Sequence, residues 1–511
     1  MIGPAFWLRN AAAKWPQRES IRDEGVVLTF GALYESAIQA AKWLHRRGKS
    51  GDRVVIALPF SVTTTIFYFG ALYARMLAVP LDPLVRPSQL ELMLRDIDPA
   101  IILGCSGLET KSTVDGLYRL DSYRDFRDLL SRDTEEGGLP VPELDDAPSR
   151  LLNIVYTSGS TGQPKGVMLN GGNLEAVTTG IIKALDISET KGIFTALPFH
   201  HTYGLSQLWL MAKLGTSLAV VPDITNMAAA RKVIAEHRID VIAGVPYHFA
   251  WLTRRFEKGR FDHIKLVTIA GAAPTSRLIE RINESFPHSR INVMYGLTEA
   301  STRLTILPAS DIHGKEGSIG LPIDGVELKV VDKNGNELGP HQGGELIARG
   351  ANITPGYWKD RELTRRRIVN GWLHTGDLAK KDEAGYYYYQ GREDLAFKSG
   401  GEKIIPQAIE KVILEIEGVQ DAFVFGMADP YKDNAIYAAV VRKKTTRVTA
   451  KDIISACHAK LDRLWVPHEV IFLEGFPRTS TGKIKYDALK EEISRLRARA
   501  NEGESQETDC Y

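Results

Sequence analysis

The sequence contains few of the residues that cross-link small secreted proteins or bind metals in cysteine clusters. Its 511 residues include only three cysteines, Cys105, Cys457 and Cys510, which are odd in number and lie far apart. None of them belongs to a CxxC pair, so we expect neither a disulfide framework nor a cysteine metal site. Free cysteines are typical of a reducing compartment, which favours the cytoplasm.

The chain also lacks an excess of either charge. Lys and Arg total 64 against 63 Asp and Glu, so we expect no nucleic-acid partner, because such proteins usually present a basic surface. Long apolar runs are missing too. The most apolar stretch, 54–81, is interrupted by Pro59 and Arg75 and falls short of the ~20 apolar residues of a membrane span. Residues 1–16 lack the apolar core and cleavage site of a signal peptide. We expect a cytoplasmic protein with no transmembrane segment.

The composition is that of an ordinary globular protein, with 44% apolar and 25% charged residues. Short apolar strands alternate with helices. Residues 26–28 precede an amphipathic helix, and residues 52–59 precede an apolar helix at about 63–76. Asn173 is expected to cap a further helix that runs to about Leu185. The alternation predicts an α/β fold with layered sheets flanked by helices.

The pattern changes at residues 391–394, where strands and helices begin to follow a compact α+β order that includes a helix at 406–417. We therefore expect a large N-terminal domain, 1–393, and a small α+β C-terminal domain, 394–498, joined by a hinge. The last residues, 499–511, are polar and without periodicity, and we expect them to be disordered.

A polar, glycine-bearing break interrupts the apolar stretch that begins at Leu151. It holds three glycines, four hydroxyl side chains and one cation, Lys165. Glycines let backbone N–H groups converge on an anion, hydroxyls donate beside them and the lysine adds a charge, so the loop is suited to phosphate. Composition alone leaves a flexible surface hairpin equally open, and the spacing is not that of a Walker A loop. The residues expected to contact phosphate are Thr157, Ser158, Gly159, Ser160, Thr161, Gly162 and Lys165.

Three further stretches complete a recognisable set. With YTSGSTGQPKG at 156–166 the chain has YGLTE at 295–299, WLHTGDLAKKDEAGYYYYQGREDL at 372–395 and PRTSTGKIKYDAL at 477–489. In this order they resemble the adenylate-forming superfamily, which includes acyl-CoA ligases, peptide-synthetase adenylation domains and luciferase. The motifs are most similar to those of AMP-forming acyl-CoA ligases. The resemblance implies ATP, Mg²⁺ and either CoA or the phosphopantetheine of a carrier protein as cofactors.

The resemblance assigns the charged groups of the first reaction. Joining a carboxylate to the α-phosphate of ATP brings two anions together, so positioned cations must offset their repulsion. Lys483 is implied to bridge the two, although it can also be read as a solvated lysine. Glu299 is implied to bind Mg²⁺ with the phosphates, and Thr298 to contact the α-phosphate. With His201, these three are the implied catalytic residues.

Other residues are implied to bind the nucleotide. Tyr295 is expected to stack on adenine beside Gly296, although an aromatic residue after a strand can also be core. Asp377 resembles the carboxylate that binds the ribose hydroxyls, with Arg392 nearby. A turn of small residues is expected to line adenine and the acid's carboxyl group, or to be only a turn: Gly271, Ala272 and Ala273.

The second reaction is implied to need a rotation of the small domain about Asp394. The loop around Ser399, Gly400 and Gly401 would then form a channel for a thiol. Many members of the superfamily carry Asp-Asp at the hinge, where this chain has Asp394 followed by Leu395.

The acid pocket is implied to lie in segments 199–205, 244–249, 270–273 and 294–305. The turn PFHHTYGLS contains no aspartate that could pair with a substrate ammonium, so an α-amino acid is disfavoured. A fatty acid and an aryl acid both remain open. Arg303 could meet a polar tail of the acid or face solvent, and we expect solvent. The expected pocket residues are His200, His201, Tyr203, Gly204 and Tyr247.

The leading hypothesis is an AMP-forming acyl-CoA ligase that makes acyl-AMP and pyrophosphate and then transfers the acyl group to CoA. One alternative is a stand-alone enzyme that loads an acyl carrier protein or an amine. Another is a non-catalytic nucleotide-binding relative. The sequence leaves the oligomeric state and the acid undetermined.

Overall fold

The computed structural model describes most of the chain up to residue 495. The described residues are 2–109, 116–132, 144, 147–158, 163–236, 239–253, 261–399, 402–429, 433–443, 446–478, 484, 488–489, 491–493 and 495. No helix in these ranges is long and apolar enough to cross a membrane. The chain divides into two compact units. The first comprises 1–329, 347–375 and 382–388, and the second comprises 330–346, 376–381 and 389–511.

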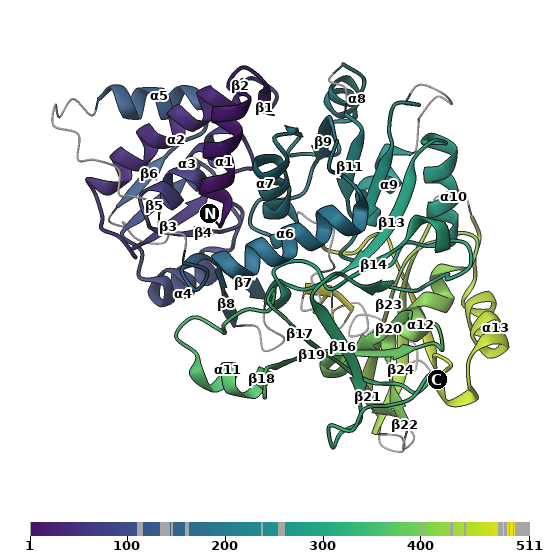
Figure 1. The fold of residues 1–511 in the computed structure, drawn as a ribbon. Helices are drawn as coiled ribbons and strands as arrows, with labels where there is room; N and C mark the ends of the chain where they lie inside the picture. The colour runs from purple at the N-terminus through teal and green to yellow at the C-terminus, as the bar shows by residue number, and fades with distance from the viewer. Residues whose placement is uncertain are drawn as a thin grey trace, which may run out of the picture. The chain divides into compact units, whose positions relative to one another are not determined.

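The first unit begins with a six-stranded sheet in the order β6-β5-β3-β4-β7-β8 (Figure 1). Neighbouring strands are parallel except for β7 and β8, which form an antiparallel hairpin. The strands are β3 (Arg53–Ala57), β4 (Leu77–Pro80), β5 (Ile101–Gly104), β6 (Leu117–Arg119), β7 (Leu151–Ser158) and β8 (Pro164–Asn170). The helices are α1 (Pro4–Lys14), α2 (Phe30–His45), α3 (Val62–Tyr73), α4 (Pro87–Ile97) and α5 (Tyr123–Ser131).

Small residues allow α2 and α3 to pack closely beside this sheet. Every residue of α3 is buried. A Cβ atom added at Gly70 of α3 would lie 2.8 Å from the Cβ of Ala40 on α2, so the glycine is needed for the close approach. The predicted helices at about 63–76 and after residues 26–28 correspond to these two elements.

A nine-stranded sheet follows, in the order β15-β14-β13-β12-β11-β9-β10-β1-β2. The central strands β1, β10, β9, β11, β12 and β13 are parallel. β9, β11 and β12 are buried along their whole length, as expected for parallel strands covered on both faces. The strands are β1 (Glu19–Arg22), β2 (Val27–Thr29), β9 (Gly192–Thr195), β10 (Ser217–Val220), β11 (Val241–Gly244), β12 (Leu266–Ile269), β13 (Arg290–Tyr295), β14 (Thr305–Leu307) and β15 (Leu321–Pro322).

Five helices accompany this sheet: α6 (Gly171–Leu185), α7 (Thr202–Leu214), α8 (Met227–Glu236), α9 (Pro246–Leu252) and α10 (Ser276–Ser285). α7 packs on β9, β10 and α6 (Figure 1). Two 3₁₀ turns, η1 (Thr298–Ala300) and η2 (Ala309–Asp311), flank β14.

The start of α6 differs from the prediction. Its cap is Asn170, not Asn173, because Asn170 has extended backbone and its side chain accepts the N–H of Asn173 at 2.8 Å. Asn173 occupies the third helical position and accepts the N–H of Asn170 in return, at 3.0 Å. Its amide nitrogen also donates to the carbonyls of Ala351 and Ile353. The helix therefore begins three residues earlier and anchors a distant segment.

A third sheet has the order β16-β17-β19-β18, with β20 also paired to β19. Its elements are β16 (Val326–Val331), β17 (Gly344–Gly350), α11 (Arg361–Arg367), β18 (Ile368–Val369), β19 (Trp372–Lys381) and β20 (Tyr387–Arg392).

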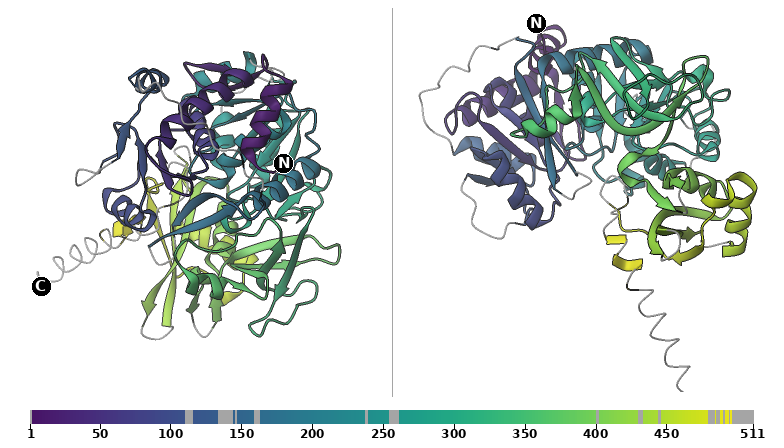
Figure 2. Two further views of the ribbon diagram at one scale, coloured as in Figure 1. Left: turned by 60° about the vertical axis from the view of Figure 1, so that its left-hand side comes forward. Right: turned by 90° about the horizontal axis from the view of Figure 1, so that it is seen from below.

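The second unit contains a sheet of β23, β24 and β25, in which β23 and β24 are antiparallel and β24 and β25 parallel. Helices α12 and α13 pack on the face that carries Val424 and Val440 (Figure 2). Its elements are η3 (Glu393–Leu395), β21 (Phe397–Ser399), β22 (Glu402–Ile404), α12 (Pro406–Leu414), β23 (Val419–Asp429), β24 (Asp433–Arg442), α13 (Ala450–Lys460), η4 (Arg463–Trp465) and β25 (Glu469–Leu473).

The predicted fold class, a large α/β part and a smaller α+β part, is confirmed. The boundary at residue 394 stays a prediction. The tail 499–511 lies outside the described residues. Of the three cysteines, Cys105 and Cys457 are described, and both are buried and free.

Candidate functional site

Several predicted site segments follow the carboxyl ends of neighbouring parallel strands. β11 lies between β9 and β12, β12 pairs with β13, and the four parallel strands end at the same edge of the sheet. The carboxyl ends of parallel strands meet at one edge of a sheet, which is where open α/β sheets bind ligands. The loops that begin at this edge include residues 196–201, 245, 270–275 and 296–297.

The turn after β13 is held in an unusual backbone conformation. A Cβ atom at Gly296 would lie 2.1 Å from the carbonyl oxygen of Thr302, so only glycine fits there. Ser301 and Thr302 have positive φ angles of 56° and 109°, and the second is a strained conformation for a β-branched residue. Asn352 secures the turn by donating to the carbonyls of Ala300 and Arg303, at 3.3 and 2.9 Å.

The same turn holds Glu299, whose predicted role is to bind Mg²⁺. Its carboxylate accepts a 2.8 Å hydrogen bond from the hydroxyl of Tyr357, and its carbonyl accepts the N–H of Thr354. Burial raises the pKa of Tyr357 above its usual value, and the charge of Glu299 adds to the shift, so the hydroxyl stays protonated as a donor. The sequence analysis missed Tyr357, and no local pattern around it indicates the contact.

The segment that carries Tyr357 is also hydrogen-bonded to the hairpin of β7 and β8, which carries the predicted phosphate loop and is called the phosphate hairpin below. The N–H of Met168 donates to Gly356, and the N–H of Trp358 donates to Gly166, at 3.0 and 2.7 Å. The Thr354 hydroxyl donates to the carbonyl of Met168 at 2.6 Å. Strand β8 and the Glu299 turn are therefore joined through residues 354–358.

Within the hairpin, Thr157 of β7 pairs with Lys165 of β8, and Ser158 pairs with Pro164. Both ends of the loop are thus placed. Gly159, Ser160, Thr161 and Gly162 lie outside the described residues. A hairpin is compatible with the phosphate reading and with the simple surface turn.

The residues expected around adenine lie at the strand edge. Tyr295 closes β13, and Tyr295, Gly296 and Thr298 are half-buried. The turn Gly271, Ala272 and Ala273 follows β12 and is exposed, with Gly271 at a φ of 86°. Their nucleotide roles stay predictions.

The second unit brings Asp377, Arg392 and Asp394 together. Arg392 makes two 3.0 Å hydrogen bonds to the carboxylate of Asp394, and its Nη1 lies 3.4 Å from Oδ1 of the buried Asp377. Burial lowers the pKa of Arg392, but the two carboxylates outweigh it, so the net pKa is raised and the guanidinium stays charged. The predicted ribose residues and the predicted hinge residue therefore form one ionic cluster.

Of the other site residues predicted in this unit, only Ser399 lies in the described part of the chain. Ser399 is buried at the end of β21, where it pairs with Glu402 of β22. Gly400, Gly401 and the predicted catalytic Lys483 lie outside the described residues.

The first acid-pocket residues lie at the start of α7. His201 is the residue before the helix, and its ring is 4.4 Å from that of His200. Burial lowers the pKa of His200, and the carboxylate of Asp82, 3.9 Å from its Nε2, opposes the shift.

Gly204 has a packing role, because a Cβ there would lie 2.1 Å from the carbonyl oxygen of Pro198. The ring of Tyr247 is in edge contact with the rings of His248 and Trp251, with centroids 6.3 Å apart in each pair.

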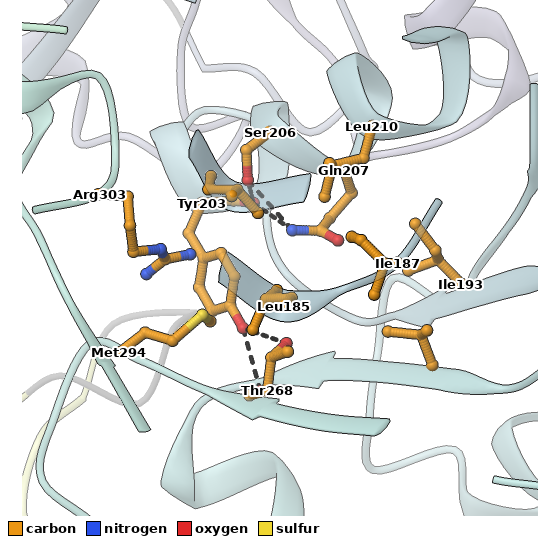
Figure 3. A pocket seen from close by; sticks show the side chains of 12 residues that line it. Leu185, Ile187, Ile193, Tyr203, Ser206, Gln207, Leu210, Thr268, Met294 and Arg303 are labelled. Atoms are coloured by element: carbon orange, nitrogen blue, oxygen red, sulfur yellow. Dashed lines mark hydrogen bonds between the residues drawn. The ribbon is translucent and has the colours of Figure 1, made fainter. Parts of the chain in front are cut away.

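A small cavity of about 10 Å³ lies between α6, α7 and the sheet (Figure 3). Of the predicted pocket residues, only Tyr203 lines it. The hydroxyl of Tyr203 donates to the carbonyl of Thr268 at 3.0 Å. The sequence analysis missed Ser206, Gln207 and Leu210, although their spacing from Tyr203 on one helical face was a usable signal. The lining residues are Ile181, Leu185, Ile187, Ile193, Tyr203, Ser206, Gln207, Leu210, Val241, Thr268, Met294 and Arg303.

Arg303 also lines this cavity, and the expectation that it faces solvent is wrong. The side chain is 2% exposed, because the turn after β13 directs it inward over the ring of Tyr203.

The described residues contain no group of three or more His, Cys, Asp or Glu that could hold a metal by themselves. Mg²⁺ is commonly bound by one or two carboxylates together with substrate phosphates. A half-buried Glu299 beside the phosphate hairpin fits that mode of binding.

Replacing Tyr357 with phenylalanine tests the link to Glu299. The variant loses a hydrogen bond to a charged group, which is typically worth about 1.5–3 kcal/mol. The Mg²⁺ concentration for half-maximal ATP-dependent activity is expected to rise roughly tenfold, with little change in fold. Tyr386→Phe is the matched control, because Tyr386 donates to Asp311 elsewhere in the same unit. Equal effects of the two variants would contradict the role of Tyr357.

Comparison with known proteins gives a consistent result. Residues 8–358 match the family model described as AMP-binding enzyme, and residues 408–483 match its C-terminal domain. The chain is 28% identical to a long-chain-fatty-acid–CoA ligase of Bacillus subtilis, over 95% of this chain and 93% of that protein. It is also 28% identical to a 2-succinylbenzoate–CoA ligase of Bacillus cereus, over 96% and 98%.

Solved structures of CoA ligases share the fold of this chain. The O-succinylbenzoate coenzyme A synthetase of Bacillus subtilis in complex with ATP and magnesium ion superposes with a TM-score of 0.83, at 25% identity. The alignment covers 95% of this chain and 99% of that one. The anthranilate CoA ligase AuaEII, at 21% identity, shares the fold with a TM-score of 0.84, over 96% of each chain. The chain therefore belongs to the AMP-binding enzyme family, within the adenylate-forming superfamily.

Proposed function

We propose that the protein is an AMP-forming acid–CoA ligase. The single observation that supports this most strongly is the attachment of the phosphate hairpin to the Glu299 turn through residues 354–358. Family membership and the CoA ligases among its relatives point the same way.

In the first step an oxygen of the acid's carboxylate attacks the α-phosphorus of ATP. The bond from that phosphorus to the bridging oxygen of the β-phosphate breaks, and pyrophosphate leaves. Lys165 and Lys483 offset the repulsion between the two anions, and Glu299 would hold a Mg²⁺ ion, which would neutralise phosphate charge. In the second step the thiolate of CoA attacks the acyl carbon, and AMP leaves with its phosphate oxygen.

The substrate is proposed to be a fatty or aryl acid. The relatives named above act on a long-chain fatty acid and on 2-succinylbenzoate, so both classes are represented among proteins similar to this chain. The cavity lining is mostly apolar and, among the described residues, contains no carboxylate that could pair with a substrate ammonium. A carrier protein or an amine as the final acceptor is the second candidate.

Carboxylate-dependent pyrophosphate release from ATP tests this function. The assay covers fatty, aryl and amino acids, each with and without CoA. We expect release with one acid class, and multiple turnovers with a thioester product when CoA is present. A single burst that CoA does not change would indicate another acceptor, and no release with any acid would contradict the proposal.

The Lys483→Ala variant serves as the catalytic control in the same assay. We expect adenylation to fall by roughly two to three orders of magnitude, as for removal of one preorganised charge, while ATP binding persists. Lys485→Ala, which removes the neighbouring lysine, is expected to stay active. If Lys483→Ala adenylates at the wild-type rate, Lys483 has no such role.

We also propose that Asp394 is the hinge between the two half-reactions. Proline at this position fixes φ near −65° and removes the N–H, so Asp394→Pro is expected to adenylate but to form no thioester. Because Asp394 pairs with Arg392, its loss alone can disturb nucleotide binding. Asp394→Ala removes the ion pair without restricting the backbone and is therefore the matched control. The hinge assignment fails if Asp394→Ala loses the thioester step to the same extent.

A further inference from the structure

Arg303 is a buried cation without an anionic partner among the described residues. Its side chain is 2% exposed, and its Nε atom has no hydrogen-bond partner. The guanidinium lies over the ring of Tyr203, whose centroid is 4.9 Å from Cζ. Burial lowers the pKa of the guanidinium to about 10, which still leaves it charged at neutral pH.

Such an arrangement is costly for folding. A charge removed from water is stable only when it is paired or hydrogen-bonded, and cation–π contact with one ring offsets only part of the penalty. Where a buried charge serves packing alone, an apolar side chain of similar volume does as well or better. A guanidinium buried in this way is therefore suited to pair with an anion.

The backbone around Arg303 fixes where that charge lies. The carbonyl of Arg303 accepts a 2.9 Å hydrogen bond from the buried Asn352, and the preceding Thr302 has its strained φ of 109°. Strain of this kind persists where surrounding structure imposes it, and it is common at binding sites. The turn thus directs the side chain into the sheet rather than to solvent.

The guanidinium lies beside a small cavity whose lining is mostly apolar. Figure 3 shows Arg303 directed at Tyr203, with Met294 alongside. The rest of the lining is aliphatic apart from Ser206, Gln207 and Thr268, and no lining residue is acidic. Its volume of about 10 Å³ is that of one water, so a larger group enters only as side chains move. Met294, with its flexible unbranched chain, is the most adaptable of them.

We propose that Arg303 binds a second carboxylate of the substrate, so that the protein activates dicarboxylic acids with an apolar middle. The inference rests on the proposed ligase function, and it narrows the substrate class. One carboxylate reacts with ATP on the side of Glu299, and the other pairs with Arg303. A planar guanidinium can bind a carboxylate through two parallel hydrogen bonds.

The inference can be tested with the wild-type protein by comparing monocarboxylic acids with dicarboxylic acids of the same carbon skeleton. Hexanoic, octanoic and decanoic acid are compared with the corresponding α,ω-diacids, and 3-phenylpropanoic acid with its para-carboxy derivative. We expect kcat/KM for the best diacid to exceed that of its monoacid by on the order of 100-fold, as for a buried charge pair. Activation of monoacids at equal or higher kcat/KM would overturn the inference and leave the ligase function standing. No activation of any acid would contradict the ligase function itself.

The variant Arg303→Met separates recognition from folding. We expect it to lose the diacid preference by on the order of 100-fold, through KM more than kcat, and to gain activity on monoacids. Its thermal stability is expected to equal or exceed that of the wild type, because a lone buried charge is removed. Arg303→Lys, which keeps the charge without the planar fork, should retain part of the preference.

Lys183→Met is the control, since Lys183 is an exposed cation on α6 that pairs with Asp324. An unchanged diacid-to-monoacid ratio in Arg303→Met would overturn the inference, as would an equal loss in Lys183→Met. If Arg303→Met does not fold, the wild-type ratio and Arg303→Lys still decide the question.

Discussion

One turn, residues 295–303, positions the groups proposed to act at both ends of the acid. Glu299 accepts a hydrogen bond from Tyr357, whose segment is bonded to the phosphate hairpin. Arg303 lines the cavity. The positive φ of Thr302 costs about 1–3 kcal/mol, and the two hydrogen bonds from Asn352 contribute about 0.5–1.5 kcal/mol each, so the two effects are comparable. Burial of the neighbouring residues further stabilises the turn. The carboxylate proposed to bind the metal and the guanidinium proposed to bind the acid are thus positioned by the same few peptide units.

The chain is nearly neutral overall, yet the proposed chemistry depends on a few localised charges. Lys165 and Lys483 are assigned to the phosphates and the reacting carboxylate, and Glu299 to the metal. Arg303 is assigned to the far end of the acid. In this account the substrates supply the anions that pair with these cations. The binding energy of the distant carboxylate can then help to orient the reacting one.

Much of the fold follows from local patterns, and the differences have physical causes. Alternating apolar strands and helices predicted the parallel sheets, and short motifs placed Tyr295 and Glu299 at the strand edge. Tyr357 and Asn352 act over 58 and 52 residues of sequence, so no local pattern indicates them. Arg303 was expected in solvent and is buried, although arginine is rarely buried without a partner. Gly204, expected in the pocket, has a packing role that the sequence did not indicate, because the backbone of Pro198 approaches it closely.

Residues 295–303 are proposed to hold the distant carboxylate of the acid through Arg303, beside the nucleotide site. A crystal structure with a non-hydrolysable acyl-sulfamoyl adenosine, whose acyl chain ends in a second carboxylate, measures this directly. The account predicts that this carboxylate lies about 2.8 Å from the guanidinium nitrogens of Arg303, the length of a charge-assisted hydrogen bond. The adenosine should lie at the strand edge near Tyr295. A second carboxylate in solvent, with Arg303 still over Tyr203, would contradict it.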